Sequence, residues 1–355
     1  MVSVLPKISE FWNQGFWLPE NVTWDNISPD SNPEILNYKH LFFAIPLTFL
    51  MLGLRYFLQC FCFAPLGTSF GIKNYKRKSP RPNLFLEGSY SVHKKLTREE
   101  ILGLAKQLDW SERNVERWLR TRRNQNKTST LDKFCESAWR VCYYLCYFII
   151  GVMVLWNKRW LWDINECWYG YPHHHIDKDV CWYLIIALSF YGSLCVSQFS
   201  DVKRKDFWQM FSHHAATVIA MSLSWVNNLL RIASLTLFVH EFTDIFLDLA
   251  KLIKYLGYQK LCDTVFVIFT VVWMVTRLGI YPFWIIRSAI WDSAEIIPVQ
   301  PLYYFFNGFL IFIFALDIFW TYFLLKIIYK FWKVGHAEGD ARSGSSDNND
   351  EPKLE

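Results

Sequence analysis

The sequence predicts an all-α, multi-pass membrane protein with seven transmembrane helices and a small cytosolic helical module. Of the 355 residues, 52% are hydrophobic and only 19% are charged, against roughly 25% charged residues in soluble domains. Seven mostly apolar stretches, each of about 19–25 residues, could cross about 30 Å of hydrocarbon as helices. These runs are continuous and do not alternate in polarity, which disfavours an outer-membrane barrel. A soluble, a collagen-like and a wholly disordered chain are excluded.

The apolar runs divide the chain into five parts. A segment of residues 1–40 precedes the first span, residues 64–130 form a polar module, residues 131–333 hold the other six spans, and residues 334–355 form a tail. The tail has six acidic and two basic residues among Gly and Ser, a composition typical of disorder. The expected spans are 41–63, 136–156, 180–199, 207–226, 229–250, 264–286 and 302–328.

Lys and Arg set the expected orientation, because they accumulate in short cytosolic loops. Residues 64–134 hold 16 Lys or Arg against 7 acids, whereas residues 1–40 hold two Lys against five acids and residues 288–301 hold no Lys or Arg. The N-terminus is therefore expected in the lumen and the C-terminus in the cytosol. Asn21 and Asn26 begin Asn-x-Ser/Thr sequons on the predicted lumenal side, so we expect glycosylation there.

The polar module contains two expected helices. Thr97 and Glu100 have capping-box spacing at the start of the first, and Ser111 precedes a second helix rich in Arg and aromatic residues. This pair resembles the back half of a homeodomain, although no first helix is evident. Thr121 stands where a homeodomain carries its adenine-reading Asn, and Thr cannot make that bidentate contact. We expect a basic module near anionic lipid and no nucleic-acid partner.

Ionisable residues at membrane depth indicate a functional site, because their burial is costly. The fourth span carries His213 and His214, and the fifth carries His240, Asp244 and Asp248 at i, i+4 and i+8, on one helix face. A short turn joins the two spans, so the imidazoles and the carboxylates are expected to meet. Imidazole can serve as a base or a nucleophile, a carboxylate can stabilise the imidazolium, and a dry site protects an activated acyl group from water.

Two further groups are isolated in the sequence. Arg277 in the sixth span and Asp317 in the seventh could complete the polar interior or could pair structurally. A metal enzyme needs three or four ligands in one place, and the nine His of the chain show none of the HxxxH or HxxHH spacings of membrane di-iron enzymes. We expect no metal.

The stretch from 201 to 256 carries a long ordered motif. It reads Asp-Val-Lys-Arg-Lys-Asp-Phe from 201, Met-Phe-Ser-His-His from 210, Trp-Val-Asn-Asn-Leu-Leu-Arg from 225 and His-Glu-Phe-Thr-Asp-Ile-Phe-Leu-Asp-Leu-Ala-Lys from 240. This resembles the Lag motif of the ceramide synthases, the core of their TLC domain. The resemblance covers about residues 131–333, and the homeobox-like module extends it back to about residue 75.

The resemblance implies N-acylation of a sphingoid base, sphinganine or sphingosine, by fatty acyl-CoA in the endoplasmic reticulum membrane, giving dihydroceramide or ceramide. Acyl-CoA is then a co-substrate and no cofactor is expected. Spans two to seven would enclose the site, and the 288–301 loop would influence acyl-chain length. Membrane lipids are expected partners, as is a second chain in a homodimer or in a heterodimer with a related synthase.

Our hypothesis for the mechanism gives these side chains roles. One histidine of the pair, His213 by preference, attacks the thioester or activates the amine, Asp244 orients or charges the imidazole partner, and His214 supports it. The motif departs from the family at Glu241, Thr243 and Asp248, where members often have Asp, Ser and Glu, so the individual roles of these side chains are open. His240 and Asp248 complete the catalytic candidates. The substrate-binding candidates are Lys203, Arg204 and Lys205, placed for CoA phosphates, with Asn227, Asn228 and Arg277.

Two other classes of protein fit the same apolar runs. A seven-span lipid receptor or transporter would bind its ligand in a polar interior without turnover. A metal-dependent membrane lipid amidase would use the histidines and carboxylates as metal ligands.

Overall fold

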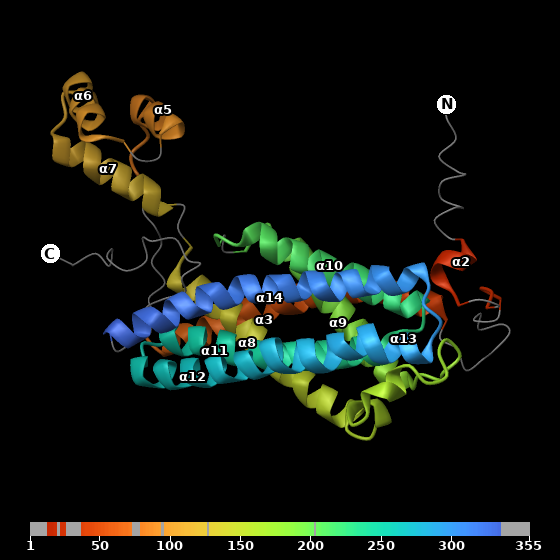
Figure 1. Ribbon diagram of the computed structural model, residues 1–355. Helices are drawn as coiled ribbons and strands as arrows, with labels where there is room; N and C mark the ends of the chain where they lie inside the picture. Colours follow the sequence, from red (N-terminus) through yellow and green to blue (C-terminus); the bar gives the residue numbers. More distant parts are fainter. Residues whose placement is uncertain are drawn as a thin grey trace, which may run out of the picture.

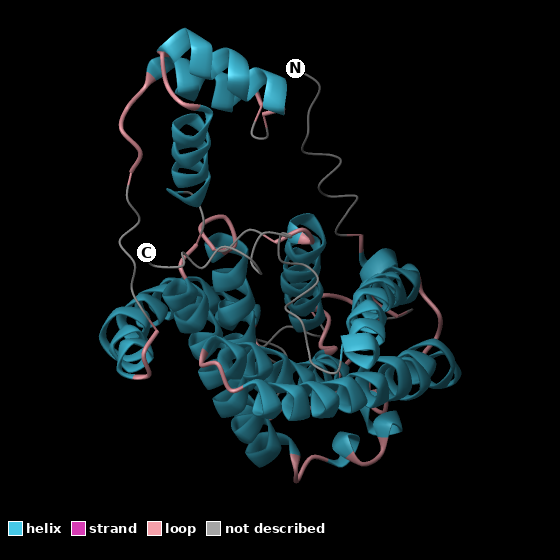
Figure 2. Cartoon of the chain, turned by 90° about the vertical axis from the view of Figure 1, so that its left-hand side faces the viewer, coloured by secondary structure: helices cyan, strands magenta, loops and turns pink. Residues whose placement is uncertain are grey.

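The computed structural model describes residues 13–19, 22–25, 37–72, 79–93, 96–125, 128–201 and 204–334. Long helices lie along one another in a single bundle, and three shorter helices stand beyond one end of it (Figure 1). No strand occurs among the described residues, as a second view also shows (Figure 2). The all-helical prediction is therefore confirmed for the part of the chain that the structure describes.

The bundle is built from seven helical stretches and is preceded by a short one. The main elements are α2 (Gln14–Trp17), α3 (Ala44–Leu58), α8 (Thr130–Leu155), α9 (Lys178–Ser197), α10 (Phe207–Val226), α11 (Leu230–Tyr255), α12 (Gln259–Trp273) and α14 (Pro301–Val334). The shorter turns around them are η1 (Tyr38–Phe43), η2 (Gln59–Phe63), α4 (Ala64–Ser69), η3 (Arg159–Leu161), η4 (Ile164–Cys167), η5 (Met274–Ile286), η6 (Ser288–Asp292) and α13 (Ser293–Ile296).

Six of these stretches close into a ring. α8 packs on α9, α9 on α10, α10 on α14, α14 on the α12–η5 helix, and that helix on α11, which returns to α8. α3, the first predicted span, lies outside this ring and packs mainly on α9. α10 and α11 are antiparallel neighbours, because Asn228 takes up a left-handed conformation (φ 55°) in the tight turn between them. The expected meeting of the fourth and fifth spans is thus confirmed.

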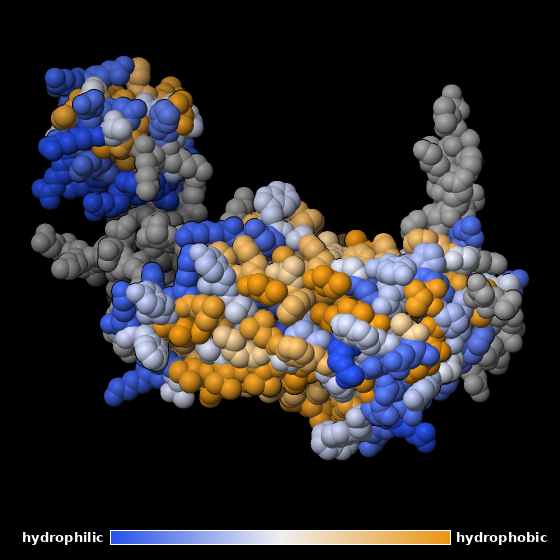
Figure 3. Space-filling model, in the orientation of Figure 1, coloured by the Kyte–Doolittle hydropathy of each residue, from blue (hydrophilic) through white to orange (hydrophobic). Residues whose placement is uncertain are grey.

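All seven predicted spans are helical, and five helical stretches have the length and the hydropathy of a membrane span. These are Tyr38–Ser69, Thr130–Leu155, Lys178–Ser197, Gln259–Ile296 and Pro301–Lys333. They correspond to the first, second, third, sixth and seventh predicted spans. α10 and α11 are helices of sufficient length, but the polar side chains they carry leave them outside this group. The surface has an apolar band between hydrophilic ends (Figure 3), as a bilayer requires.

The sixth span is longer than the sequence predicts. Helical structure continues from α12 through η5, η6 and α13 to Ile296, so the expected loop at 288–301 reduces to residues 297–300. The reason is local. Residues 288–296 lack Gly and Pro, so the backbone can extend the helix. The stretch Met274–Ile286 is wound as a π-helix and contains Pro282, and such wide turns are frequent at functional sites.

The module has three helices, α5 (Leu84–Val92), α6 (Arg98–Leu108) and α7 (Glu112–Gln125). The Thr97–Glu100 capping box forms as predicted. The expectation that no helix precedes this pair was wrong, because Asn83 caps α5 by accepting from the amides of residues 85 and 86. The three helices share a small separate core of Leu86, Tyr90, Ala105, Val115, Trp118 and Leu119.

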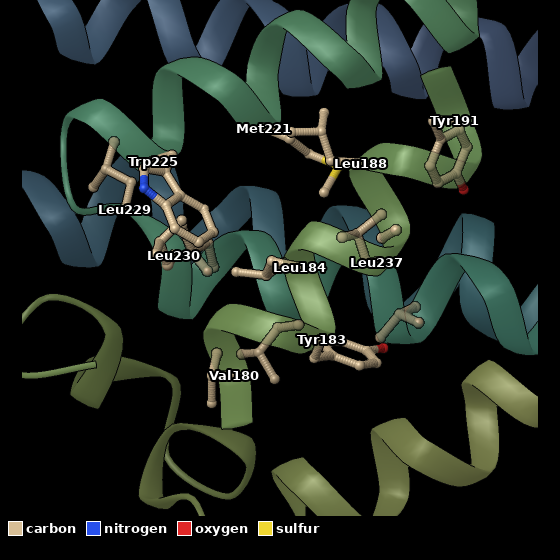
Figure 4. Packing of buried hydrophobic residues seen from close by; sticks show 14 of the residues in the cluster. Val180, Tyr183, Leu184, Leu188, Tyr191, Met221, Trp225, Leu229, Leu230 and Leu237 are labelled. Atoms are coloured by element: carbon tan, nitrogen blue, oxygen red, sulfur yellow. The ribbon is translucent and has the colours of Figure 1, made fainter. Parts of the chain in front are cut away.

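The main apolar core lies on the side of the ring where α10 turns into α11. Leu184 and Leu188 of α9 belong to it, together with Met221 of α10 and Leu237 of α11 (Figure 4). Because apolar side chains line this side of the ring, the polar groups of the bundle lie toward the opposite side, where α10 begins and α11 ends.

Candidate functional site

A cavity that opens to solvent lies on that opposite side of the ring, and its volume, open mouth included, is about 1270 Å³. Its walls come from α8, α9, α10, α11, α12 and α14. Polar and charged residues line one part of it: Arg140, Tyr144, Tyr191, Arg204, His213, His214, Asp244, Asp248, Lys251, Lys254 and Arg277. Aromatic and aliphatic side chains of α12 and α14 line the rest, including Phe266, Phe269, Trp273, Trp320, Phe323 and Leu324.

The predicted histidine pair faces this cavity. His213 and His214 follow each other on α10, so their side chains diverge, yet both line the cavity and their ring centroids are 5.7 Å apart. The His213 ring stands edge-on to Trp320 at 5.4 Å. Its Nδ1 is buried and has no hydrogen-bond partner among the residues that the structure describes, which leaves Nε2 as the nitrogen that can meet a ligand.

The carboxylates of α11 lie across the cavity from the pair. Asp244 and Asp248 both line it, in agreement with their shared helix face. Asp244 retains 21% side-chain exposure and lies 3.3 Å from a guanidinium nitrogen of Arg277. Asp248 is nearly fully buried and pairs with Lys251 at 2.8 Å. Asp244 is therefore the more accessible of the two.

His240 belongs to a second layer behind the cavity. Its Nδ1 donates to the carbonyl oxygen of Thr236 at 2.7 Å, and its Nε2 lies 3.5 Å from Asp317. Arg277 pairs with Asp317 at 3.3 Å and donates to the backbone carbonyl of His240 at 2.9 Å. The two groups that are isolated in the sequence, Arg277 and Asp317, therefore meet, and they connect the sixth and seventh spans to the fifth.

Glu241 is fully buried next to this layer. Neither of its carboxylate oxygens accepts a hydrogen bond of normal length from the described residues. The hydroxyls of Tyr143, Tyr183 and Tyr191 are close enough to interact with its charge. In the sequence, Glu241 stands out only as a departure from the Lag motif. The tyrosines around Glu241 belong to α8 and α9, which lie outside that motif, so the motif could not reveal them.

The remaining predicted site residues are dispersed. Arg204 lines the cavity, whereas Lys205 is exposed and Lys203 lies outside the described residues. Asn227 and Asn228 lie at the other end of α10, where the Asn228 amide donates to the carbonyl oxygens of Pro172 and His174. These amides line neither large cavity, so their role in substrate binding stays a prediction. The sequons at Asn21 and Asn26 also lie outside the described residues.

Residues that sequence reasoning did not select complete the cavity. Arg140 of α8 is 14% exposed and pairs with Glu136 at 2.9 Å, and it joins Arg204 at the polar part of the wall. Trp320 comes from α14, more than one hundred residues after His213. No local pattern marks either residue, because their importance depends on which helices become neighbours.

A second, largely apolar cavity lies toward the opposite end of the ring, and its volume, open mouth included, is about 950 Å³. Its wall includes Met221, Leu237 and Leu310, together with Ile297, Pro298 and Gln300 before α14 and with Trp168 and Tyr171 of the α8–α9 connection. Among the described residues, no group of three His, Cys, Asp or Glu side chains is arranged to hold a metal ion.

Comparison with known proteins gives a consistent result. Residues 133–326 match the TLC domain family. The chain is 40% identical to ceramide synthase 5 of Homo sapiens over 345 residues, which are 97% of this chain and 88% of that protein. It is 38% identical to ceramide synthase 3 of Mus musculus over 324 residues, 90% of this chain and 83% of that protein. It is 36% identical to ceramide synthase 4 of Homo sapiens over 334 residues, which are 94% of this chain and 85% of that protein.

Proposed function

The chain belongs to the ceramide synthase family, and from this premise we propose that the cavity of His213 and Asp244 is where it acts. The enzyme is an N-acyltransferase that joins a fatty acyl group from acyl-CoA to a sphingoid base, giving ceramide or dihydroceramide. One observation carries the assignment of the site. An imidazole whose buried Nδ1 has no partner among the described residues and a partly exposed carboxylate line the same largely apolar cavity.

The first proposed step is attack by His213 on the thioester. Its Nε2 lone pair forms a bond to the acyl carbon, the carbon–sulfur bond breaks, and the electron pair leaves on the CoA sulfur, which takes up a proton from solvent. The His213 ring keeps its proton on Nδ1, so an acyl-imidazolium results. The apolar walls around Trp320 exclude water, which would otherwise hydrolyse this intermediate.

The second proposed step is attack by the sphingoid amine on the acyl carbon. The new carbon–nitrogen bond replaces the bond to His213, and the proton lost by the amine passes to a base in the cavity. Asp244 stabilises the imidazolium that these steps create, as a carboxylate does in catalytic triads. His214 supports the reaction next to His213. His240 contributes from behind the cavity through Asp317, and Asp248 contributes from the cavity wall, where it pairs with Lys251.

The polar part of the cavity wall fits the CoA portion of the co-substrate. Arg140, Arg204, Lys251 and Lys254 gather there, and CoA phosphates require cations. Lys203 and Lys205 belong to the same predicted basic mouth. The acyl chain would lie among the apolar residues, and the residues of the 297–300 stretch that line the second cavity would limit its length. We propose acyl-CoA as co-substrate and no cofactor.

We further infer a seven-span topology in the endoplasmic reticulum membrane, with a lumenal N-terminus and a cytosolic C-terminus. Supporting this, α2 lies at one end of the bundle, and the basic helices α5–α7 and the last residues of α14 lie toward the other (Figure 1). Glycosylation at Asn21 and Asn26 and dimerisation with a like or related chain belong to the same proposal. The module 64–130 would face anionic lipid and not nucleic acid.

The full-length protein, purified in detergent, tests the proposal with sphinganine and a panel of acyl-CoAs of different chain length. We expect dihydroceramide as the product. His213→Ala and Asp244→Ala should each abolish its formation, whereas His173→Ala, a change at an exposed histidine of the α8–α9 connection, should leave it unaffected.

The intermediate is tested separately. Protein incubated with acyl-CoA alone should gain the mass of one acyl group, and His213→Ala should not. Turnover that survives the His213 and His214 double change would refute the histidine mechanism. Binding of acyl-CoA without product from any chain length would favour the receptor, and loss of activity with a metal chelator would favour the amidase.

A further inference from the structure

A residue that lies outside the Lag motif, Gln198, forms a hydrogen bond with the imidazole of His214. Nδ1 of this imidazole lies 3.1 Å from Oε1 of Gln198, in the turn that follows α9. The other end of the same side-chain amide, Nε2 of Gln198, donates to the backbone carbonyl oxygen of Phe207 at 2.6 Å. Gln198 thus connects the end of α9 to the start of α10 and to the second histidine of the pair.

These two hydrogen bonds together determine which nitrogen of His214 carries the proton. A carbonyl oxygen can only accept, so the amide atom that contacts Phe207 must be the NH₂ group. The amide atom that contacts His214 is then the oxygen, which also can only accept, so Nδ1 of His214 must be the donor. The proton of the neutral ring is therefore on Nδ1, and Nε2 carries the lone pair.

The turn that holds Gln198 is itself fixed to the first span. Arg55 of α3 forms two hydrogen bonds to the carboxylate of Asp201, at 2.5 and 3.1 Å, and Ser197 donates to the same carboxylate at 3.3 Å. Both side chains of the Arg55–Asp201 pair are close to 10% exposed. A buried, bidentate pair of this kind has one geometry, so α3 fixes the position of the turn from outside the ring.

Several charged and titratable groups surround His214. They are His213 on its own helix, Tyr191 of α9, Arg140 and Glu136 of α8, and Asp201, Arg204 and Asp206 of the α9–α10 connection. Three acids line the adjoining smaller cavity. Glu136 and Asp201 are paired with Arg140, Arg204 and Arg55, and Asp206 accepts a hydrogen bond from Nε1 of Trp320 at 3.1 Å. Gln198 is the one neighbour that hydrogen-bonds the ring among the described residues.

We propose that Gln198 is a positioning residue for the acyl transfer, which fixes His214 as the Nδ1–H tautomer so that Nε2 can take the proton of the attacking amine. The inference rests on the proposed function. In the second step the amine nitrogen bonds to the acyl carbon, the acyl–His213 bond breaks, and the amine proton passes to Nε2 of His214. The resulting imidazolium then returns this proton to solvent. Without Gln198 the ring can rotate, or its proton can move from Nδ1 to Nε2. In that second tautomer Nε2 has no lone pair to accept the proton of the amine.

Two substitutions in the full-length purified protein test this role. Gln198→Leu removes both hydrogen bonds, and we expect kcat to fall at least about tenfold, with little change in KM for acyl-CoA. Gln198→Glu keeps an oxygen acceptor and adds a negative charge, which stabilises the imidazolium. It should therefore retain more activity than Gln198→Leu at its own optimum, with the acid limb of its pH–kcat profile about one pH unit higher than in the wild type.

Gln209→Leu is the matched control, because Gln209 lies on α10, does not line the cavity and makes no side-chain hydrogen bond with a described residue. The thermal unfolding midpoints of all three variants are measured beside the kinetics. A Gln198→Leu variant that behaves as Gln209→Leu, or a Gln198→Glu variant with an unmoved pH profile, would overturn the inference. A wild-type protein without synthase activity, or an active His213→Ala, would instead overturn the proposed function.

Discussion

Arg277 and Asp317, forty residues apart in the chain, form an ion pair at 3.3 Å in the middle of the bundle. Their side chains are 4% and 0% exposed. The guanidinium also lies 3.3 Å from Asp244 and stacks on Trp273, with its carbon 5.2 Å from the ring centroid. One arginine thereby positions a carboxylate of the site, because a charge buried in an apolar bundle must be compensated by its neighbours.

Arg277→Leu should therefore destabilise the protein severely. It leaves Asp317 buried without its partner, and breaking such a pair costs about 3–5 kcal/mol. The double variant Arg277→Leu, Asp317→Leu should recover much of this stability, because two leucines leave no uncompensated charge buried between the helices. It should not recover activity. Thermal unfolding in detergent measures both. Arg287→Leu, at a 64% exposed arginine ten residues further on, is the control. A double variant less stable than the single one would contradict the account.

The first span packs on the ring through a close approach at Gly192. A Cβ added to Gly192 would lie 2.9 Å from Oγ1 of Thr48, and the same hydroxyl contacts the carbonyl oxygen of Ser189. Gly192→Ala should lower the free energy of unfolding by about 1–3 kcal/mol through overpacking. A second change, Thr48→Ala, should restore part of it by removing the opposing atoms. Gly53→Ala, on α3 with no atom within 4 Å of the added Cβ, should be neutral. If the effects of Gly192→Ala and Thr48→Ala on the free energy of unfolding were simply additive, α3 and α9 would not be in contact at these two residues.

Lys254 should contribute to the binding of the CoA phosphates. It lines the cavity beside Lys251, so Lys254→Gln should raise KM for acyl-CoA about tenfold, the worth of one charged hydrogen bond, without lowering kcat. The same variant should treat an acyl-pantetheine, which keeps the thioester and lacks the nucleotide phosphates, like the wild type. Lys178→Gln, an exposed lysine at the start of α9 and the other end of the bundle, is the matched control. An equal rise in KM for both donors would place the CoA phosphates elsewhere.

The loop between α8 and α9 should lose stability in acid. Burial, and then the charge of Arg231, hold the pKa of His174 at about 3, against an ordinary value of 6.5. Below pH 6.5 the unfolded chain gains a proton that the folded protein does not, so stability is complete above pH 6.5 and is lost as the pH falls. The loss between pH 7.5 and pH 5.5 should be about 1 kcal/mol. Thermal unfolding at both values measures it.

Two substitutions isolate this effect of His174. His174→Gln, which cannot titrate, should flatten the pH dependence of the unfolding midpoint. His173→Gln, at its exposed neighbour, should leave that dependence as in the wild type. A pH dependence that persists in His174→Gln would assign it to another group.

The sequence was most informative where function follows local spacing. The i, i+4, i+8 spacing on α11 correctly placed Asp244 and Asp248 on one cavity wall, and the short turn after α10 correctly brought the histidine pair to the same cavity. The sequence could not pair Arg277 with Asp317, nor add Gln198 and Trp320, because each lies on a helix whose neighbours are set by packing over long separations. It also missed the first helix of the module and underestimated the length of the sixth span, since helix ends depend on single caps.

By itself, the sequence determined that this protein is helical and suited to a bilayer, and it determined which two neighbouring helices carry an imidazole pair and a row of carboxylates. Apolar length and helical periodicity are properties of one segment at a time, so no fold is needed to see them. Only the tertiary structure decided which nitrogen of His214 is free, which cation accompanies Asp244 and which walls enclose them. Those facts depend on contacts between side chains of separate helices, and such contacts form only when the helices have packed together.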